Sequence, residues 1–421
     1  HLWFTDVLGF LKSFTMDVAE LELAMTEGMG FDGSSIQGFA RIEESDMVAY
    51  PDPTTLRILP WRQSGQAVAT MFCDIVRPDG TPYEADPRYV LKRQLDRAAA
   101  LGYTFFVGPE LEYYYFKDDR GTELLDHGTY FDQTTRDLAV DLRKDTVRML
   151  KRFGIQVEYS HHEVGPSQHE IDLRYAEALA MADNVMTYRV VVKEVAQANG
   201  VYASFMPKPM FGEAGSGMHV HQSLFKDGKN AFYDANDPHH LSATAKSYIA
   251  GILAHARETT LVTNQWVNSY KRLVSGYEAP VYICWAHRNR SALVRVPMYK
   301  PGKENATRVE LRSPDPACNP YLAFAVMLAA GLEGIEKGLT LPADVTDDVY
   351  EMTQPERDAC GIGTLPGDLD EAIVEMEKSE LVRSALGDQV FEYILRNKKA
   401  EWMNYHTRVT PYELEEYLPL L

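Results

Sequence analysis

The sequence predicts an α+β fold, with a small β-rich N-terminal domain followed by a larger domain of sheet and helices. Residues 1–80 contain short strand-like runs that are broken by Gly, Pro and Asp. The first clear helix starts only at Asp86-Pro87, where Asp can cap the helix and Pro fits its first turn. After that point strands and helices mix without the strict alternation of a doubly wound fold. We therefore predict domains at 1–80 and 87–421.

Apolar spacing and breaking residues predict the elements of the larger domain. The helix after Asp86 places Val90, Leu91 and Ala98 on one face and ends before Gly102. Further helices are predicted over about 133–152, 175–198, 242–260 and 319–337, and through most of the last 60 residues. Strands are predicted over 103–116, 155–160, 216–225, 292–297 and 307–313.

The composition is that of a globular protein with an acidic excess. Of 421 residues 45% are hydrophobic, and 42 Lys and Arg stand against 61 Asp and Glu, a net charge of −19. This charge argues against a general binder of nucleic acid or anionic membranes. No apolar run approaches the roughly 20 residues that a membrane helix needs, so we expect no membrane partner.

The cysteines and the first residues bear on where the protein works. The four cysteines are scattered without a metal-type pair such as C-x-x-C, which predicts a reducing, cytoplasmic location. The chain begins without Met, inside a predicted strand and without a signal-peptide pattern. We therefore expect that further residues precede His1.

Charged side chains occur at the period of a β-strand in three separate segments. Residues i and i+2 of a strand point to one face, while the residue between them points to the other. In each segment one face can pack and the other is polar. The polar faces carry Glu110 and Glu112, His219 and His221, and Arg308, Glu310 and Arg312.

An antiparallel sheet with one wet face is the simplest alternative explanation. A wet face usually also carries Lys, Thr, Ser and Gln, whereas these polar faces select only Glu, His and Arg. Glu163 and Glu170 add two carboxylates, and Gly165 and Pro166 between them favour a turn followed by a strand over a helix. We therefore predict a charged cavity lined by strands.

The carboxylates of this cavity predict divalent cations. The candidate ligands are five glutamates and one histidine: Glu110, Glu112, Glu163, Glu170, Glu310 and His219. Oxygen-dominated sites with one imidazole suit Mg²⁺ or Mn²⁺ better than Zn²⁺ or Cu²⁺. Close carboxylates stay ionised in a cavity only when a cation neutralises them. Two adjacent divalent ions would do this and would also clamp a transferring phosphoryl group.

Arginines supply the complementary charge. Their planar guanidinium groups fit carboxylate and phosphate oxygens, which phosphoryl transfer requires. Gly215 and Gly217 allow close backbone approach to a ligand. Surface ion pairs remain the alternative for the arginines outside RVELR. The candidates are Arg272, Arg290, Arg295, Arg308 and Arg312.

Along essentially its whole length the chain resembles class I glutamine synthetase, the bacterial and archaeal type. The following segments occur in the family's order at about its spacing: GPELEYYYF, HHEVGPSQHEID, GSGMHVHQSLF, NSYKRLVSGYEAP, NRSALVRVP and TRVELRSPDPACNPYLA. FDGSSIQGF and IEESDM match as well. The resemblance implies an N-terminal β-grasp-like domain and a catalytic domain with a curved antiparallel sheet funnel flanked by helices, ending in a helical strap.

The resemblance also implies residue roles and two or three Mg²⁺ or Mn²⁺ per active site. One metal would be held by Glu112, Glu163 and Glu170, and another by Glu110, His219 and Glu310. ATP would contact Glu158, His221, Ser223, Arg290 and Arg295. Glutamate would contact Gly215, Arg272, Glu278, Arg290 and Arg312. The catalytic positions would be Asp32, Glu278 and Arg295, with Asp32 donated by a neighbouring subunit.

The resemblance implies a reaction in two steps, and it also implies an oligomeric assembly. ATP phosphorylates the side-chain carboxylate of glutamate, and ammonia then displaces phosphate to give L-glutamine. Glu278 would sit on a flap that excludes water from the acyl phosphate, and Asp32 would help to deprotonate ammonium. The family implies a homododecamer of two stacked hexameric rings, tied together by the C-terminal tail. Without the resemblance, that tail is an ordinary amphipathic helix.

Some positions depart from the family pattern or bear on regulation. Ala214 stands where many members have Asn. This Ala is either a neutral variant or a sign that the protein joins glutamate to an amine other than ammonia. Arg41 matches an arginine that supports glutamine feedback in one subclass, and a plain surface Arg is an equal alternative. Tyr350 lies where another subclass is adenylylated, but its flanks differ and we predict no modification. The segment 298–307 receives no role.

Three functions therefore compete. The first is glutamine synthesis from ammonia. The second is a γ-glutamyl–amine ligase on the same fold, acting on ethanolamine or a polyamine, which Ala214 alone favours. The third is a non-catalytic, metal-dependent assembly or regulatory protein, against which the intact ligands and the presence of Asp32 and Glu278 argue.

Overall fold

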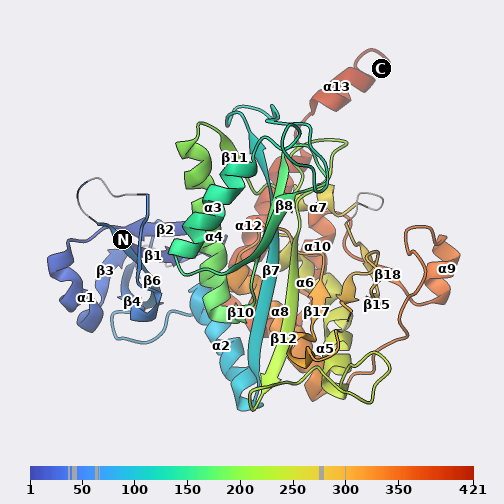
Figure 1. The fold of residues 1–421 in the computed structure, drawn as a ribbon, viewed down its shortest axis with the longest axis horizontal. Coiled ribbons are helices and arrows are strands. Elements are labelled where there is room, and N and C mark those ends of the chain that lie inside the picture. Colours follow the sequence, from blue (N-terminus) through green and yellow to red (C-terminus); the bar gives the residue numbers. More distant parts are fainter. Residues whose placement is uncertain (37, 40–44, 62–64, 66, 275–278, 299) are drawn as a thin grey trace.

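The computed structural model describes residues 1–36, 38–39, 45–61, 65, 67–274, 279–298 and 300–421. Two sheets organise the chain, and the N-terminal sheet lies at one side of the molecule (Figure 1). In the described part of the chain this sheet has the strand order β2-β1-β6-β4-β3, with β5 paired to β6. β1 and β6 run parallel and the other pairs antiparallel. The strands are β1 (Leu2–Thr5), β2 (Leu11–Phe14), β3 (Met29–Asp32), β4 (Asp46–Pro51), β5 (Arg57–Ile58) and β6 (Ala69–Val76).

The larger sheet carries the polar strand faces. Among the described residues its order is β15-β16-β17-β12-β7-β9-β8, with β10 and β11 paired to β7 and β13 to β12. The pairs are antiparallel except β15–β16, so the antiparallel expectation holds with that exception. The strands are β7 (Thr104–Phe116), β8 (Val157–His162), β9 (Gln168–Leu173), β10 (Ala176–Glu177), β11 (Tyr202–Ser204), β12 (Met218–Lys226), β13 (Lys229–Asn230), β15 (Trp285–His287), β16 (Val294–Val296) and β17 (Val309–Leu311).

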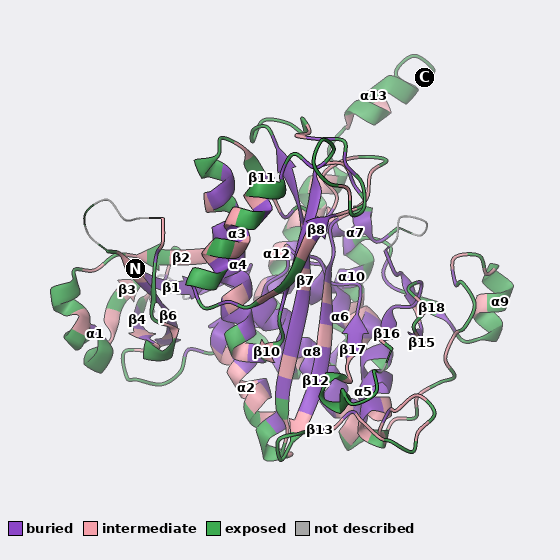
Figure 2. Cartoon of the chain, in the orientation of Figure 1, coloured by how far each residue is buried: buried purple, intermediate pink, exposed green. Residues whose placement is uncertain are grey.

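Helices pack behind the larger sheet around a buried central helix. α8 (Pro320–Glu336) is apolar on all sides, as expected of a helix surrounded by protein. Its start is fixed by Asn319, whose side chain accepts hydrogen bonds from the first helical N–H groups. The other helices of this layer are α2 (Pro87–Ala100), α3 (Val140–Arg152), α4 (Ala178–Ala198), α5 (Ala243–Ala254), α6 (Ala256–Thr263) and α12 (Asp388–His406). Figure 2 shows the buried residues concentrated where these helices meet the sheet.

Shorter elements complete the chain. A two-stranded ribbon joins β14 (Tyr282–Ile283) to β18 (Gly363–Thr364). The last helix projects away from the body of the molecule (Figure 1). The short helices are α1 (Leu21–Glu27), α7 (Ser269–Arg272), α9 (Gln354–Ala359), α10 (Leu369–Glu377), α11 (Glu380–Leu386) and α13 (Pro411–Tyr417). The 3₁₀ turns are η1 (Val18–Glu20), η3 (Pro53–Thr55) and η4 (Glu304–Ala306).

The observed elements follow the sequence predictions with two differences. The helix predicted from about residue 133 begins only at Val140, because Thr134 has φ of 55°, a left-handed conformation that a right-handed helix excludes. The helix predicted over 242–260 is interrupted at His255, which leaves helical geometry with φ of −105°. The domain division at 80–87 stays a prediction. No helix of the described residues is long and apolar enough to cross a membrane.

Candidate active site

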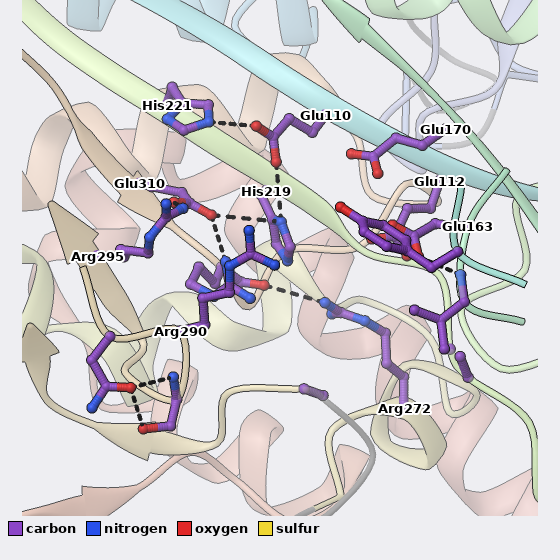
Figure 3. A pocket seen from close by; sticks show the side chains of 18 of the residues that line it. Glu110, Glu112, Glu163, Glu170, His219, His221, Arg272, Arg290, Arg295 and Glu310 are labelled. Atoms are coloured by element: carbon purple, nitrogen blue, oxygen red, sulfur yellow. Dashed lines mark hydrogen bonds and ion pairs between the residues drawn. The ribbon is translucent and has the colours of Figure 1, made fainter. Parts of the chain in front are cut away.

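The predicted strand-lined cavity is present on the polar face of the larger sheet. It has a volume of about 820 Å³, and Figure 3 shows charged side chains from several strands facing one another across it. Its lining includes thirteen of the predicted site residues, which are Glu110, Glu112, Glu163, Glu170, Gly215, His219, His221, Arg272, Arg290, Arg295, Arg308, Glu310 and Arg312. The cavity therefore gathers residues that are far apart in the sequence.

Strand register brings these side chains together. Glu110 on β7 lies opposite His219 on β12, and Glu112 lies opposite Glu170 on β9. His221 in turn lies opposite Glu310 on β17. Directly opposite residues of an antiparallel pair share a face. The polar faces of the separate strands therefore form one continuous polar surface.

One group of side chains centres on Glu110. His221 Nε2 lies 2.6 Å from Glu110 Oε1, and His219 Nδ1 lies 3.2 Å from Glu110 Oε2. Burial favours the neutral carboxyl, but His221 and His219 outweigh it and hold the pKa of Glu110 well below its usual value. Burial and Arg312 lower the pKa of His219, so its ring is kept neutral, as a cation ligand must be.

Glu310 is the most deeply buried carboxylate of this group. Its two oxygens accept from Arg295 Nη1 at 2.5 Å and from Arg312 Nη1 at 2.6 Å. Burial raises the pKa of Glu310, but the charges of His221, Arg312 and His219 outweigh burial, so the pKa lies below its ordinary value. Glu310 is therefore ionised and fixes the two arginines in place.

A second group lies at the hairpin between β8 and β9. His161 Nε2 lies 3.3 Å from both Glu163 Oε1 and Glu170 Oε2. Burial and the neighbouring carboxylates Asp172 and Glu112 raise the pKa of Glu170 well above its usual value. The proposed turn followed by a strand is correct, because Glu163 follows β8 and Glu170 lies within β9.

Glu112 stands between the two groups. Its Oε2 accepts from the backbone N–H of Gly217 at 2.8 Å and from Gln168 Nε2 at 3.2 Å. Burial and Glu163 raise the pKa of Glu112 to about 8, although Arg272 opposes the shift. Without a cation this part of the cavity therefore holds protons that a bound cation would release.

The donor set fits hard divalent cations. In two groups that line the cavity the possible ligand atoms all lie within 4.8 Å of one another; these are Glu110, His221 and Glu310, and His161, Glu163 and Glu170. Both are dominated by carboxylate oxygen, which suits Mg²⁺ or Mn²⁺. The grouping overlaps the implied ligand sets but has His221 in place of His219, and His161 in place of Glu112.

Arg272 lines the cavity and is also held by the backbone behind it. Its guanidinium donates to the carbonyl oxygens of Ser313, Pro314 and Arg312, at 2.6, 3.3 and 3.2 Å. A Cβ atom at Gly217 would lie 2.5 Å from Arg272 Nη2. The close backbone approach predicted for this glycine is therefore an approach to Arg272.

A second cavity of about 320 Å³ adjoins the first. It holds Glu158 and Ser223, the two predicted ATP contacts that do not line the larger cavity. The two cavities share four residues, which are Glu110, Tyr159, His221 and Arg308. Lys300 and residues 305–307 form part of its wall, so these described residues of the unassigned segment lie beside the site.

Three predicted residues are not placed at either cavity. Asp32 lies at the end of β3 on the N-terminal sheet, exposed, and its carboxylate accepts from the N–H of Ser34 at 2.8 Å. β3 and the cavity strand β17 lie on different sides of the molecule (Figure 1). Glu278 and Arg41 lie outside the described residues.

Sequence reasoning missed several cavity residues that the same strand rule could have found. Gln168 and Asp172 flank Glu170 at i−2 and i+2 on β9, so they share its face. Tyr159 and His161 are likewise two apart on β8 and both line the larger cavity. Tyr350, considered only for modification, also lines this cavity.

Comparison with known proteins identifies the family to which the chain belongs. The glutamine synthetase catalytic-domain family matches residues 84–417, and the glutamine synthetase β-grasp domain matches residues 1–78. The chain therefore belongs to the glutamine synthetase family. The predicted fold class, a β-grasp domain and a catalytic domain with a curved sheet flanked by helices, is confirmed.

Its relatives place the chain among the class I, bacterial and archaeal members. It is 58% identical to the glutamine synthetase of Mycolicibacterium smegmatis, over 100% of this chain and 96% of the relative. It is 54% identical to that of Methanosarcina mazei, over 99% of this chain and 94% of the relative.

Solved structures share the fold along the whole chain. One is titled as a GmaS–ADP complex, with a TM-score of 0.90, 32% identity and coverage of 99% of this chain and 96% of that one. Another is Plasmodium falciparum glutamine synthetase, with a TM-score of 0.88, 25% identity and coverage of 99% and 95%. Membership of this family implies that the protein uses a divalent metal and ATP.

Proposed function

We propose that the two adjoining cavities carry out ATP-dependent ligation of ammonia to the γ-carboxylate of L-glutamate through γ-glutamyl phosphate. The chain is a glutamate–ammonia ligase, because it belongs to the family and its full-length relatives at 47–58% identity are named glutamine synthetase. The observation that supports the mechanism is one cavity with two carboxylate groups and facing arginines.

The metal roles fit the donor groups. Two or three Mg²⁺ or Mn²⁺ would be held per site, one set by Glu112, Glu163 and Glu170 and the other by Glu110, His219 and Glu310. His161 and His221 lie within reach of these sets. When bound, such ions neutralise the carboxylates and the phosphoryl oxygens.

The arginines and the smaller cavity suit the first chemical step. ATP would occupy the smaller cavity at Glu158, His221 and Ser223, with its phosphates directed toward the larger one. A γ-carboxylate oxygen of glutamate attacks the γ-phosphorus, and ADP leaves. Arg290 and Arg295 would compensate the charge of the transferring group, with Arg295 fixed by Glu310. Gly215, Arg272, Arg290 and Arg312 would border the glutamate.

The second step needs a base, and of the two residues proposed for it Asp32 lies away from the cavity of its own chain and Glu278 lies outside the described residues. Ammonium would lose one proton to Asp32 of a neighbouring subunit, and the freed ammonia would attack the acyl carbon and displace phosphate. Glu278 would accept the second proton, which the nitrogen sheds as the amide forms. The exposed position of Asp32 on the N-terminal sheet supports this sharing. We propose an assembly of two stacked hexameric rings, because α13 projects from the body and, with the residues that follow it, exposes apolar side chains, which are Tyr412, Leu414, Leu418 and Leu420.

The acceptor can be tested directly. Phosphate release and product would be measured with glutamate, ATP and Mg²⁺, comparing ammonium with methylamine, ethanolamine and a polyamine. We expect turnover with ammonium at the highest kcat/KM. At position 214 the protein offers the cavity no polar side chain, and the Ala214 carbonyl accepts from the Tyr114 hydroxyl at 2.7 Å. Turnover with an amine but none with ammonium would reject ammonia as the acceptor.

The shared site predicts complementation between two inactive proteins. Asp32→Ala removes the donated base, and Glu310→Gln disables the receiving cavity, so each homo-oligomer should lose most activity. A co-assembled mixture pairs an intact Asp32 with an intact Glu310 at about one site in four if assembly is random. We expect about a quarter of wild-type activity in the mixture. Recovery no greater than the sum of the separate variants would contradict a site shared between subunits.

A further inference from the structure

The segment 213–217 forms part of the wall of the larger cavity, although it belongs to no helix or strand. Its residues Ala214 and Gly215 both line the cavity. A segment outside regular structure has no continuous ladder of backbone hydrogen bonds, so its polar groups need other partners. Three side chains supply such partners, and they reach three carbonyl oxygens in a row.

These carbonyl oxygens belong to residues 213–215. Lys208 Nζ donates to the first of them. The Tyr114 hydroxyl donates to the second at 2.7 Å, and Gln168 Nε2 donates to the third at 3.0 Å. Tyr114 and Gln168 lie directly opposite each other on β7 and β9. Two of the three contacts therefore come from one place on the sheet.

Tyr114 is fully buried and is placed for this contact. It shares one face of β7 with Glu110 and Glu112, because these residues are separated by steps of two. A Cβ atom at Gly165 would lie 2.2 Å from the Tyr114 hydroxyl oxygen, so this glycine leaves the space that the hydroxyl occupies. A phenylalanine ring could pack in the same place but could not donate to the Ala214 carbonyl.

The contact sets the orientation of the peptide between Ala214 and Gly215. A trans peptide is planar, and its C=O and N–H groups point in opposite directions. Because the Ala214 C=O points at Tyr114, the Gly215 N–H points away from Tyr114. This N–H has no acceptor within the described part of the chain. At the wall of a cavity, such a group is a donor that a ligand can use.

We propose that Tyr114 is a positioning residue for glutamate, whose hydroxyl holds the Ala214–Gly215 peptide so that it presents a free N–H to the bound amino acid. The inference rests on the proposed function, in which Gly215 borders glutamate. Arg272 packs against the same glycine, since a Cβ atom at Gly215 would lie 2.7 Å from Arg272 Cγ. The backbone donor and the positive charge of Arg272 together suit an amino acid that carries two carboxylates.

Ligand affinities of the Tyr114→Phe variant test this role without measuring turnover. Calorimetric titration in Mg²⁺ would give the Kd of a non-hydrolysable ATP analogue, and then the Kd of glutamate with the analogue bound. The substitution keeps the ring and removes only the hydroxyl. We expect the Kd of glutamate to rise about 3–10-fold, as for one lost hydrogen bond, and the Kd of the analogue to stay within about twofold of wild type.

Tyr115→Phe is the matched control. It removes a hydroxyl from the next residue of β7, which is also buried. The Tyr115 side chain points to the opposite face of the strand, where its hydroxyl lies 3.5 Å from that of Tyr113. This control should bind glutamate and the analogue as the wild type does. Thermal unfolding of both variants would measure separately what each hydroxyl contributes to stability.

The outcomes for Tyr114→Phe decide the inference. A rise in the Kd of glutamate alone would support it. An unchanged Kd of glutamate would overturn it, and so would an equal loss of affinity for glutamate and the analogue, because that pattern indicates a general loss of structure. The proposed function fails separately, if the wild-type protein binds glutamate but makes no glutamine from it.

Discussion

Replacement of Glu310 by Gln is expected to lower kcat/KM for glutamine synthesis by roughly 10²–10³-fold or more. Glu310 is fully buried and accepts from Arg295 and Arg312. Its charge also faces His219, at 3.6 Å between Nδ1 and Oε1. The amide has the same shape but no charge, so both guanidinium groups lose their compensation and the cation site loses a ligand.

The same substitution should also reduce stability. Removal of one partner from a buried ion pair typically costs about 3–5 kcal/mol, because it leaves an uncompensated charge. Chemical denaturation would measure this loss, and steady-state kinetics with varied Mg²⁺ would measure the catalytic effect. Glu380→Gln, an exposed change at the start of α11, is the matched control. Activity within a few-fold of wild type would show that Glu310 is not part of the site.

Much of this site could be predicted from strand alternation alone. A strand shows its two faces in its own sequence, so Glu110 with Glu112, and His219 with His221, could be placed together. Which strands pair, and in which register, depends on contacts between distant parts of the chain. Thus the sequence could not show that Glu110 lies opposite both His219 and Asp172.

The ionisation of the carboxylates could not be predicted either, for the same reason. Glu112 and Glu310 have the same side chain and line the same cavity. The pKa of Glu112 is raised to about 8 by burial and Glu163, whereas His221 and Arg312 bring that of Glu310 below its usual value. These neighbours come from other strands and loops, so the difference arises only when the sheet has formed.

The helix predictions failed where local geometry overrode apolar spacing. Residues 133–139 continue a helical pattern in the sequence but form turns before α3. Within this region Asp137 accepts from Arg143, and the N–H of Leu138 donates to Asp126 from the preceding loop, so these groups make buried polar contacts instead of a helix. Short-range spacing does not reveal that role, because the partners lie on the β8–β9 hairpin and on α3.

Substitution of Asp126 is the second change for which we expect a large effect, on both stability and metal affinity. Asp126 holds the turn that carries Glu163. Asp126 Oδ1 accepts from the N–H groups of Gly128 and Ser167, and Oδ2 accepts from that of Leu138. His162 joins this network: its Nε2 lies 3.0 Å from Asp126 Oδ1, and its Nδ1 lies 2.7 Å from the Glu163 carbonyl oxygen.

The hydrogen-bond partners define the charge of His162. A carboxylate and a carbonyl can only accept, so both ring nitrogens must donate and the ring is an imidazolium. Burial opposes this charge, but Asp126 and the Glu163 carbonyl outweigh it and raise the pKa of His162. Asp126 therefore holds a charged ring whose other nitrogen fixes the backbone at Glu163.

Asp126→Ala should accordingly lower the free energy of unfolding by about 3–5 kcal/mol, since it leaves three N–H groups and the imidazolium without an acceptor. We also expect Mn²⁺ affinity to fall on the order of 10–100-fold, because Glu163 loses its positioning. Urea unfolding of the metal-free protein and Mn²⁺ titration of the folded protein would measure the two effects. Asp132→Ala, in the same loop, should change stability by less than about 1 kcal/mol. Lower stability with unchanged Mn²⁺ affinity would mean that Asp126 supports the fold but does not position Glu163.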